Sequence, residues 1–256
     1  MLIKIDNINI PDLEIYSSLR ESAFREDGSF IADSPKVVNL VLESGVEIKS
    51  ILATQEYYDE FSLLLKDKNI PKKYLTTKDE MKKIVGHKIH HNCMMHGIRP
   101  RDITIEDLSD EVLLLDGITS AENVGSIVRS CAALGVNSLV IANETPHPFN
   151  RRALRVSMGY STFIKTHMHK DIKKSIQEFQ VKGYRVFAAE VAENATPLSL
   201  VKTPDKWVLV MGHEGRGIAD DILSLCDEIV SIEMQAGVKS FNVGVAASLM
   251  MYKFMN

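Results

Sequence analysis

Three short motifs in the second half of the chain carry side chains that can orient or polarise a reacting group. The first has the form N-x-G-x-x-x-R, with Asn123, Gly125 and Arg129. An amide can orient a neighbouring group, and a guanidinium can clamp a phosphate or a developing oxyanion. On a helix, Asn123 and Arg129 lie nearly two turns apart, near the carboxyl edge of a sheet. Taken alone, the motif is more typical of a surface amide and a surface arginine beside an ordinary crossover helix.

The second motif, Gly212 to Gly217, follows the apolar run WVLV at 207–210. Its three glycines allow a sharp turn and close approach of a ligand, and a helix expected from about Ile218 would offer unpaired N–H groups. The motif departs from the dinucleotide fingerprint G-x-G-x-x-G and places Glu214 inside the loop. A plain glycine turn is the alternative interpretation.

The third motif, Ser240 to Ser248, opens the last helix of the chain. Ser240 is predicted as its N-cap, and Asn242 stands in the first turn as a polar group at the mouth of a site. For the first motif, Thr119 and Glu122 are predicted to form a capping box for a helix that Gly135 ends.

The elements that must position these motifs form an α/β pattern. Apolar runs that predict strands alternate with segments long enough for crossover helices, which favours a parallel sheet covered on both faces. These runs lie at 112–115, 138–142, 161–166, 184–191, 207–212 and 228–234.

The N-terminal hundred residues predict a smaller mixed α/β module. Helical patterns occupy 10–26, 34–44 and 57–66, and strand-like runs occupy 47–53 and 72–75. The polar stretch after it reads as a linker. We therefore expect one domain over 1–100, a linker over 101–110 and a second domain over 111–256.

Composition sets the broad class. The 256 residues are 45% hydrophobic with a net charge of −4, and no signal peptide or membrane span is apparent, so a cytoplasmic protein with three reduced cysteines is expected. Between Lys66 and Arg101 ten basic residues face three acidic ones. Such a run is more often a solvated face than a phosphate track, and charge alone does not decide.

Histidines and a cysteine crowd residues 87–96 (His87, His90, His91, Cys93 and His96). Their spacing matches no standard zinc motif, so no metal site is expected. His91 and His96 are expected to contact RNA or to lie on the surface.

In their order and spacing, the three motifs resemble the signatures of the SpoU/TrmH family of SPOUT-class methyltransferases. The resemblance covers 113–254, including the segment 152–160, and residues 28–54 are similar to that family's ribosomal-protein-like substrate-binding domain. Phe241 and Gly244 depart from the usual leucine and serine, and Lys253 from a common acidic residue.

The resemblance implies a trefoil-knotted C-terminal domain, a homodimer with a composite active site, and S-adenosylmethionine as methyl donor. It implies a catalytic cluster of Asn123, Arg129, Glu214 and Asn242. The donor would contact Leu209, Gly212, Ile232, Met234, Phe241, Val243 and Ala246, and RNA would contact Arg99, Arg101, Arg152 and Arg155.

The implied reaction is 2′-O-methylation of a ribose in structured RNA, which needs alignment and loss of the hydroxyl proton but no metal. A guanidinium has no acceptor, so Arg129 is interpreted as a clamp, whereas Glu214 could hold that arginine or act as the base. Ribosomal RNA is favoured over transfer RNA. The alternatives are a transfer-RNA enzyme, a non-catalytic RNA-binding protein of the same fold and, less favoured, a dinucleotide-dependent oxidoreductase.

Overall fold

The structure, a computed structural model, describes residues 1–18, 27–86 and 89–256. The chain forms two compact units: Met1–Arg101 together with Pro148–Thr162, and Asp102–His147 together with Phe163–Asn256. The short segment Pro148–Thr162, which lies within the second half of the sequence, thus belongs to the first unit. The sequence had predicted one continuous domain from residue 111. No helix among the described residues is long and apolar enough to span a membrane.

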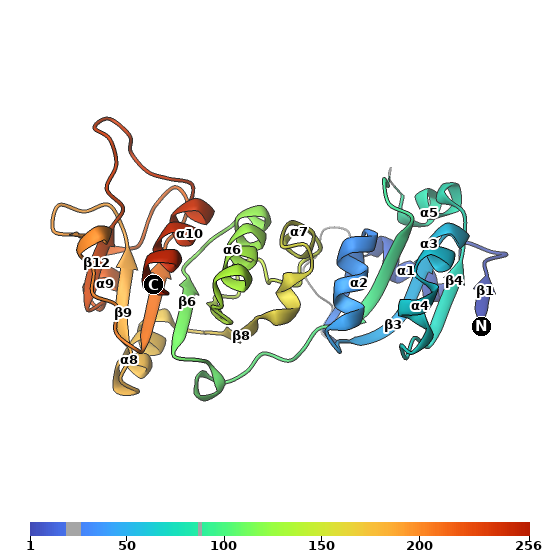
Figure 1. Ribbon diagram of the computed structural model, residues 1–256, viewed down its shortest axis with the longest axis horizontal. Helices are drawn as coiled ribbons and strands as arrows, with labels where there is room; N and C mark the ends of the chain where they lie inside the picture. Colours follow the sequence, from blue (N-terminus) through green and yellow to red (C-terminus); the bar gives the residue numbers. More distant parts are fainter. Residues whose placement is uncertain (19–26, 87–88) are drawn as a thin grey trace. The chain divides into compact units, whose positions relative to one another are not determined.

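The first unit is built on a five-stranded mixed sheet in the order β1-β4-β3-β5-β2 (Figure 1). The pairs β1/β4 and β3/β4 are parallel, whereas β5 runs antiparallel to β3 and β2. The strands are β1 (Leu2–Lys4), β2 (Ser29–Asp33), β3 (Glu47–Ala53), β4 (Lys72–Leu75) and β5 (Cys93–Ile98), and the helices are α1 (Pro11–Ser18), α2 (Pro35–Glu43), α3 (Gln55–Glu60), α4 (Ser62–Lys66) and α5 (Lys78–Val85).

Local signals explain most boundaries in this unit. Thr77 and Glu80 form a capping box at the start of α5, and Gly86 ends it in the left-handed conformation (φ 75°). The helix predicted over 57–66 is two helices, because Phe61 leaves helical geometry (φ −106°, ψ 24°). Of the helix predicted over 10–26, residues 19–26 lie outside the described residues.

The returning segment contains α7 (Arg151–Val156), which packs against β2. Phe149 and Leu154 are buried in the hydrophobic core of the first unit, and the Phe149 ring meets the Phe30 ring edge-on with centroids 4.9 Å apart. Burial of these two side chains gives the segment its place in the first unit.

The second unit contains a seven-stranded sheet, all of whose pairs are parallel, in the order β10-β12-β9-β11-β6-β7-β8. The predicted α/β class with a parallel sheet is confirmed. The strands are β6 (Glu111–Leu115), β7 (Ser138–Ile141), β8 (Lys165–Met168), β9 (Arg185–Ala189), β10 (Thr196–Pro197), β11 (Trp207–Met211) and β12 (Glu228–Ser231). The strand predicted over 161–166 lies later, because Tyr160–Phe163 form a 3₁₀ turn.

Helices cover both faces of this sheet, as buried apolar strands require. On one face, α8 (Ile172–Val181) and α9 (Asp220–Leu223) contribute Ile176, Phe179 and Ile222 to a core with β6, β9 and β11. On the other, α6 (Ala121–Leu134) and α10 (Val243–Phe254) pack side by side (Figure 1). There Phe254 meets the rings of Phe187 and Trp207 at 4.9 and 5.1 Å.

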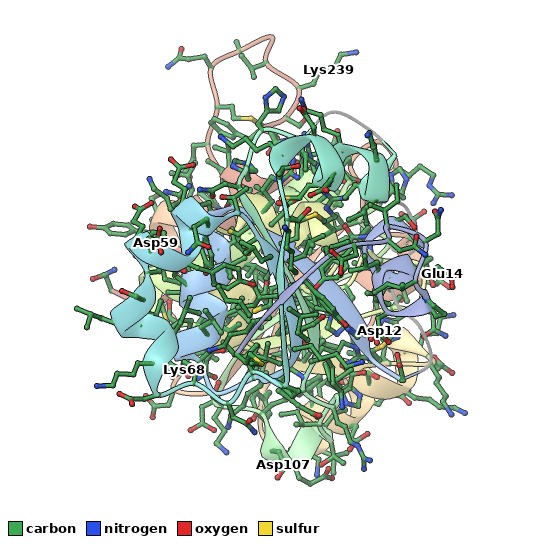
Figure 2. All side chains as sticks on the ribbon, turned by 90° about the vertical axis from the view of Figure 1, so that its right-hand side faces the viewer. Asp12, Glu14, Asp59, Lys68, Asp107 and Lys239 are labelled. Carbon is green, nitrogen blue, oxygen red and sulfur yellow. The ribbon has the colours of Figure 1, made fainter. Side chains whose placement is uncertain are left out.

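The helix α9 begins at Asp220, slightly later than predicted, so residues 212–219 are all available to form a loop. The loop between β12 and α10 extends beyond α10 (Figure 1), and Lys239 lies near its tip (Figure 2). These two loops and the start of α6 frame the candidate active site.

Candidate active site

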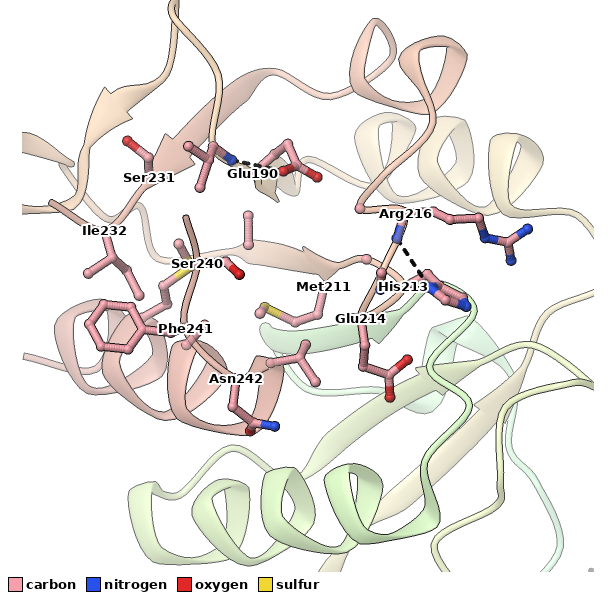
Figure 3. Close-up of a pocket in the computed structure, with 18 of the residues that line it drawn as sticks. Glu190, Met211, His213, Glu214, Arg216, Ser231, Ile232, Ser240, Phe241 and Asn242 are labelled. Atoms are coloured by element: carbon pink, nitrogen blue, oxygen red, sulfur yellow. Dashed lines mark hydrogen bonds between the residues drawn. The ribbon is translucent and has the colours of Figure 1, made fainter. Parts of the chain in front are cut away.

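A cavity of about 610 Å³ lies at the carboxyl ends of β9, β11 and β12, beside the start of α10 (Figure 3). Open parallel sheets hold their ligands at this edge, and the volume falls in the range of small-molecule sites. All its lining residues belong to the second unit.

The glycine motif forms a closed loop on one wall. The N–H of His213 donates to the carbonyl of Gly217 at 3.2 Å, and the N–H of Gly217 donates back at 2.9 Å. A Cβ on Gly212 would lie 2.6 Å from the carbonyl carbon of Gly217, and Gly217 itself has φ +67°. Only glycine at both positions permits so tight a loop, which exposes backbone groups to the cavity.

A chain of side-chain hydrogen bonds joins the three motifs. Asn242 Nδ2 donates to Asn123 Oδ1 at 3.0 Å, and Asn123 Nδ2 donates to Glu214 Oε1 at 2.9 Å. Both amides are therefore oriented, since one end of each is fixed as donor and the other as acceptor. Figure 3 shows Glu214 and Asn242 on the same side of the cavity, toward α6.

Two predicted caps were wrong, and the corrections explain how the chain is anchored. Ser120, not Thr119, caps α6 by accepting from the N–H of Asn123, because Thr119 instead donates its N–H to Glu214. Asn242, not Ser240, caps α10, and its Oδ1 accepts from the N–H groups of residues 244 and 245. The same amide thus caps a helix and holds the neighbouring amide.

Glu214 is held as a carboxylate. Burial alone would raise its pKa, but the hydrogen bond from Asn123 and the N–H donors of Thr119 and Ser120 outweigh burial and lower the pKa below its usual value. These donors lie 2.9 to 3.2 Å from its oxygens. Glu214 therefore acts as an anion that ties the loop after β11 to the loop after β6.

Arg129 is not part of this chain. It lies on α6 after Asn123, its side chain is exposed, and it does not line the cavity. Its guanidinium forms no hydrogen bond or ion pair with any residue in 1–18, 27–86 and 89–256, Glu214 included. The structure therefore unites three of the four predicted catalytic residues within one chain.

The residues predicted to hold a donor mostly line the cavity. Six of them do so, namely Gly212, Ile232, Met234, Phe241, Val243 and Ala246, whereas Leu209 is fully buried in the middle of β11. Phe241 stands where the resembled family usually has a smaller leucine. Its side chain lies at the rim and is 41% exposed, so its ring leaves the cavity open.

Glu190 is a cavity residue that the sequence analysis missed. It follows β9, and its carboxylate accepts from the N–H groups of Val191 and Ile218 at 2.9 Å each. A Cβ on Gly217 would lie 2.2 Å from Glu190 Oε2, so the carboxylate occupies the space that this glycine leaves. An acidic residue directly after a buried strand was the available signal.

The four predicted RNA-binding arginines divide in two. Arg101 and Arg152 are exposed, and Arg99 is half-buried and donates to the carbonyl of Pro100 at 3.1 Å. Arg155 is instead engaged with the buried Asp33.

The histidine-rich stretch does not form a cluster of metal ligands in the described residues, which exclude His87. His96 Nε2 lies 2.9 Å from the hydroxyl of Ser29, a hydrogen bond across β5 and β2. His91 lies on the wall of a small pocket in the first unit.

The chain matches the SpoU rRNA Methylase family over residues 110–252. It is 28% identical to an uncharacterised tRNA/rRNA methyltransferase of Mycobacterium bovis over 70% of this chain and 65% of that protein. It is 33% identical to a protein of Staphylococcus haemolyticus named as a TrmH family tRNA/rRNA methyltransferase, over 56% of this chain and 57% of the other. The chain thus spans less than two thirds of the length of these relatives.

Solved structures share the fold over nearly the whole chain. The AdoMet-bound rRNA methyltransferase of Sinorhizobium meliloti has a TM-score of 0.84 at 18% identity, covering 99% of this chain and 97% of that one. An RNA 2′-O ribose methyltransferase has a TM-score of 0.79 at 17% identity, covering 99% and 98%.

Proposed function

Because the chain belongs to the SpoU rRNA methylase family, we propose that it transfers a methyl group from S-adenosylmethionine to a ribose 2′-hydroxyl of structured RNA. The observation that carries the proposal is the hydrogen-bonded chain of Asn242, Asn123 and Glu214 beside the cavity. Ribosomal RNA is the substrate we favour, and transfer RNA is the alternative.

The cavity fits the donor in two respects. Gly212, Gly215 and Gly217 line the cavity without side chains, so their backbone atoms are available to the polar edge of an adenine. Ile232, Met234 and Phe241 supply apolar surface for its faces. When bound, S-adenosylmethionine supplies an electrophilic methyl group on a sulfonium.

We assign Glu214 a positioning role. Its oxygens already accept N–H groups from Thr119, Ser120 and Asn123, and its pKa lies below the ordinary value, so it is a poor proton acceptor near neutral pH. It holds Asn123, and through it Asn242, in one orientation. The two amides then present fixed dipoles to the ribose that enters beside them.

Arg129 is assigned to the clamp on a substrate phosphate or developing oxyanion, contributed across a homodimer. Arg129 does not join the hydrogen-bonded series of Asn242, Asn123 and Glu214 in its own subunit, as expected if it completes the site of a partner subunit. Val245, Leu249 and Tyr252 form an exposed apolar stripe on α10, 41 to 63% exposed. Such a stripe at helical spacing is suited to self-association. The trefoil knot implied by the family resemblance stays a prediction.

The test is transfer of labelled methyl from S-adenosylmethionine to unmodified ribosomal and transfer RNAs, separated on a gel before counting. Label in a ribosomal RNA band supports the proposal, and label only in transfer RNA supports the alternative substrate. Donor binding without label in any RNA would favour a non-catalytic RNA-binding protein.

A further inference from the structure

The first unit contains a small pocket at the end of β2 that none of the motifs explains. We call it the arginine pocket. Its volume is about 110 Å³, well below the roughly 300 Å³ at which pockets for whole small molecules begin. Among the residues that line it are Asp33, His91, Cys93, Met94, Arg151 and Arg155.

Asp33 organises the pocket. It is 3% exposed and accepts from Arg151 Nε at 2.8 Å, from Arg151 Nη2 at 2.6 Å and from Arg155 Nε at 2.8 Å, with Arg155 Nη2 also paired to it. Burial alone would raise the pKa of Asp33, but the two arginines outweigh burial and lower it. Asp33 is therefore an anion that fixes two guanidinium groups side by side.

The pocket has a surplus of positive charge. Two guanidinium groups share one carboxylate, and no other acidic side chain pairs with Arg151 or Arg155 in the part of the chain that the structure describes. Each guanidinium has five N–H groups, and only those on Nε and Nη2 face Asp33. The other N–H groups of each arginine are therefore available as donors to a ligand. Two like charges held so close repel each other, and a second anion would relieve that repulsion.

The remaining walls suit a small anion with polar oxygens. Burial, as the largest effect, lowers the pKa of His91, so its ring is neutral and can donate or accept without adding charge. Cys93 is fully buried and Met94 nearly so, which closes the pocket on its inner side. Arg155, at 39% side-chain exposure, leaves the outer side accessible.

We propose that the arginine pocket binds one phosphate group of the RNA chain, held by the N–H groups that Arg151 and Arg155 do not give to Asp33. Guanidinium groups match phosphate oxygens in pairs, and Asp33 removes the entropy cost of ordering them. The pocket is too small for a nucleoside, so it contributes affinity and register without reading a base. This inference rests on the proposed RNA substrate.

The test compares Arg155→Gln with Arg185→Gln, which removes the same charge from a partly exposed pair with Glu228 in the second unit. Affinity for labelled, unmodified ribosomal RNA is measured over a series of KCl concentrations. For Arg155→Gln we expect a several-fold loss at low salt and a salt slope smaller by about 1. Arg185→Gln should match the wild type, and both variants should bind S-adenosylmethionine normally.

Folding is checked by thermal unfolding, because Asp33 keeps Arg151 as its partner in Arg155→Gln. If that variant unfolds, Arg155→Lys replaces it: the charge stays and the paired N–H groups are lost, so RNA affinity should fall with the wild-type salt slope. A folded Arg155→Gln with wild-type affinity and slope would overturn the proposal and leave Asp33 and its arginines as a structural tie.

Two further outcomes separate the sources of failure. If inorganic phosphate at matched ionic strength stabilises the wild type and not Arg155→Gln while RNA affinity is unchanged, the ligand is a free phosphate and the RNA assignment is overturned. If the wild type binds RNA through the pocket yet methylates none, the proposed function fails while the pocket stands.

Discussion

At the scale of single residues, the central assignment is that Glu214 works through Asn123. Replacing Glu214 with glutamine removes the charge and places an amide against the N–H groups of Thr119 and Ser120. We expect kcat for methyl transfer to fall about 10- to 100-fold, with donor affinity nearly unchanged, because the two asparagines lose their fixed orientation. Single-turnover transfer and calorimetry of donor binding measure the two effects.

Glu122→Gln is the control, since Glu122 is exposed at the same helix start and contacts the Ser120 hydroxyl at 3.3 Å. The pH dependence tests whether Glu214 titrates near neutral pH, as an efficient general base would. The lowered pKa means that the contribution of the Glu214 charge is present above its usual pKa and is lost only as pH falls through the lowered value. The ratio of wild-type to variant kcat should be constant from about pH 6 to pH 8; a ratio that climbs through an ionisation there would make Glu214 the base.

Gly217 gives a second prediction at this scale. A methyl group in Gly217→Ala would meet Glu190 Oε2 at 2.2 Å at a backbone of φ +67°, so the loop must shift. We expect donor affinity to fall by about 10-fold or more. Gly183→Ala is matched for positive φ (+84°) but has open space around it, so it carries only the backbone cost of about 1 kcal/mol. Equal donor affinity in both variants would show that the tight loop is unnecessary.

At the scale of elements, α10 carries one face toward α6 and another toward solvent. Ser130 and Ser248 hydrogen-bond across the helices at 2.7 Å, and a Cβ on Gly244 would lie 3.2 Å from the Ser126 hydroxyl oxygen. The glycine that departs from the family's usual serine therefore allows close approach of the two helices. This packing places Asn242 within reach of Asn123.

The exposed face of α10 leads to a prediction about assembly. If Arg129 acts across a dimer, Arg129→Ala and Glu214→Ala are each inactive, but a refolded equimolar mixture should recover about a quarter of wild-type activity, from the intact site of each mixed dimer. Leu249→Lys, on the apolar stripe, should yield monomers by light scattering, whereas Leu200→Lys, 69% exposed elsewhere, should not. No recovery in a mixture that contains mixed dimers would place Arg129 in its own subunit's site.

The elements also show what the sequence could predict. The motif order located Asn123, Glu214 and Asn242, and the apolar runs located the main parallel strands within a few residues. The caps were misassigned because Ser240 and Asn242 have similar capping preference, and only the path of the loop decides which one the helix uses. The separation of Arg129 depends on which face of α6 is buried by α10, and a motif does not specify that face.

At the scale of the whole molecule, the segment 148–162 belongs to the first compact unit although the residues on both sides of it in the sequence belong to the second. Buried apolar side chains and the ion pairs with Asp33 hold the segment in the first unit. Its composition, basic residues between apolar ones, fits either unit, so the sequence did not predict this division. Asp33 supplies the specific tie, because a carboxylate that is 3% exposed must be paired.

This tie predicts a difference in stability. Arg151→Gln leaves Asp33 buried with one partner, and we expect the free energy of unfolding to fall by about 2 kcal/mol. The partly exposed pair of Arg185 and Glu228 should contribute less than about 1 kcal/mol, so Arg185→Gln is the control in urea unfolding. Because the pKa of Asp33 is lowered, the stabilisation is lost as pH falls through that lowered value. Equal stability of the two variants would show that the pairing of Asp33 with Arg151 does not stabilise the fold.

The central claim is that the methyl group reaches a ribose oxygen. The measurement that tests it most directly is alkaline hydrolysis of RNA labelled by the wild-type protein, because a methylated 2′-oxygen cannot attack its neighbouring phosphodiester. We predict that the label remains in alkali-resistant dinucleotides. Label recovered in mononucleotides would mean that a base had been methylated, which would contradict it.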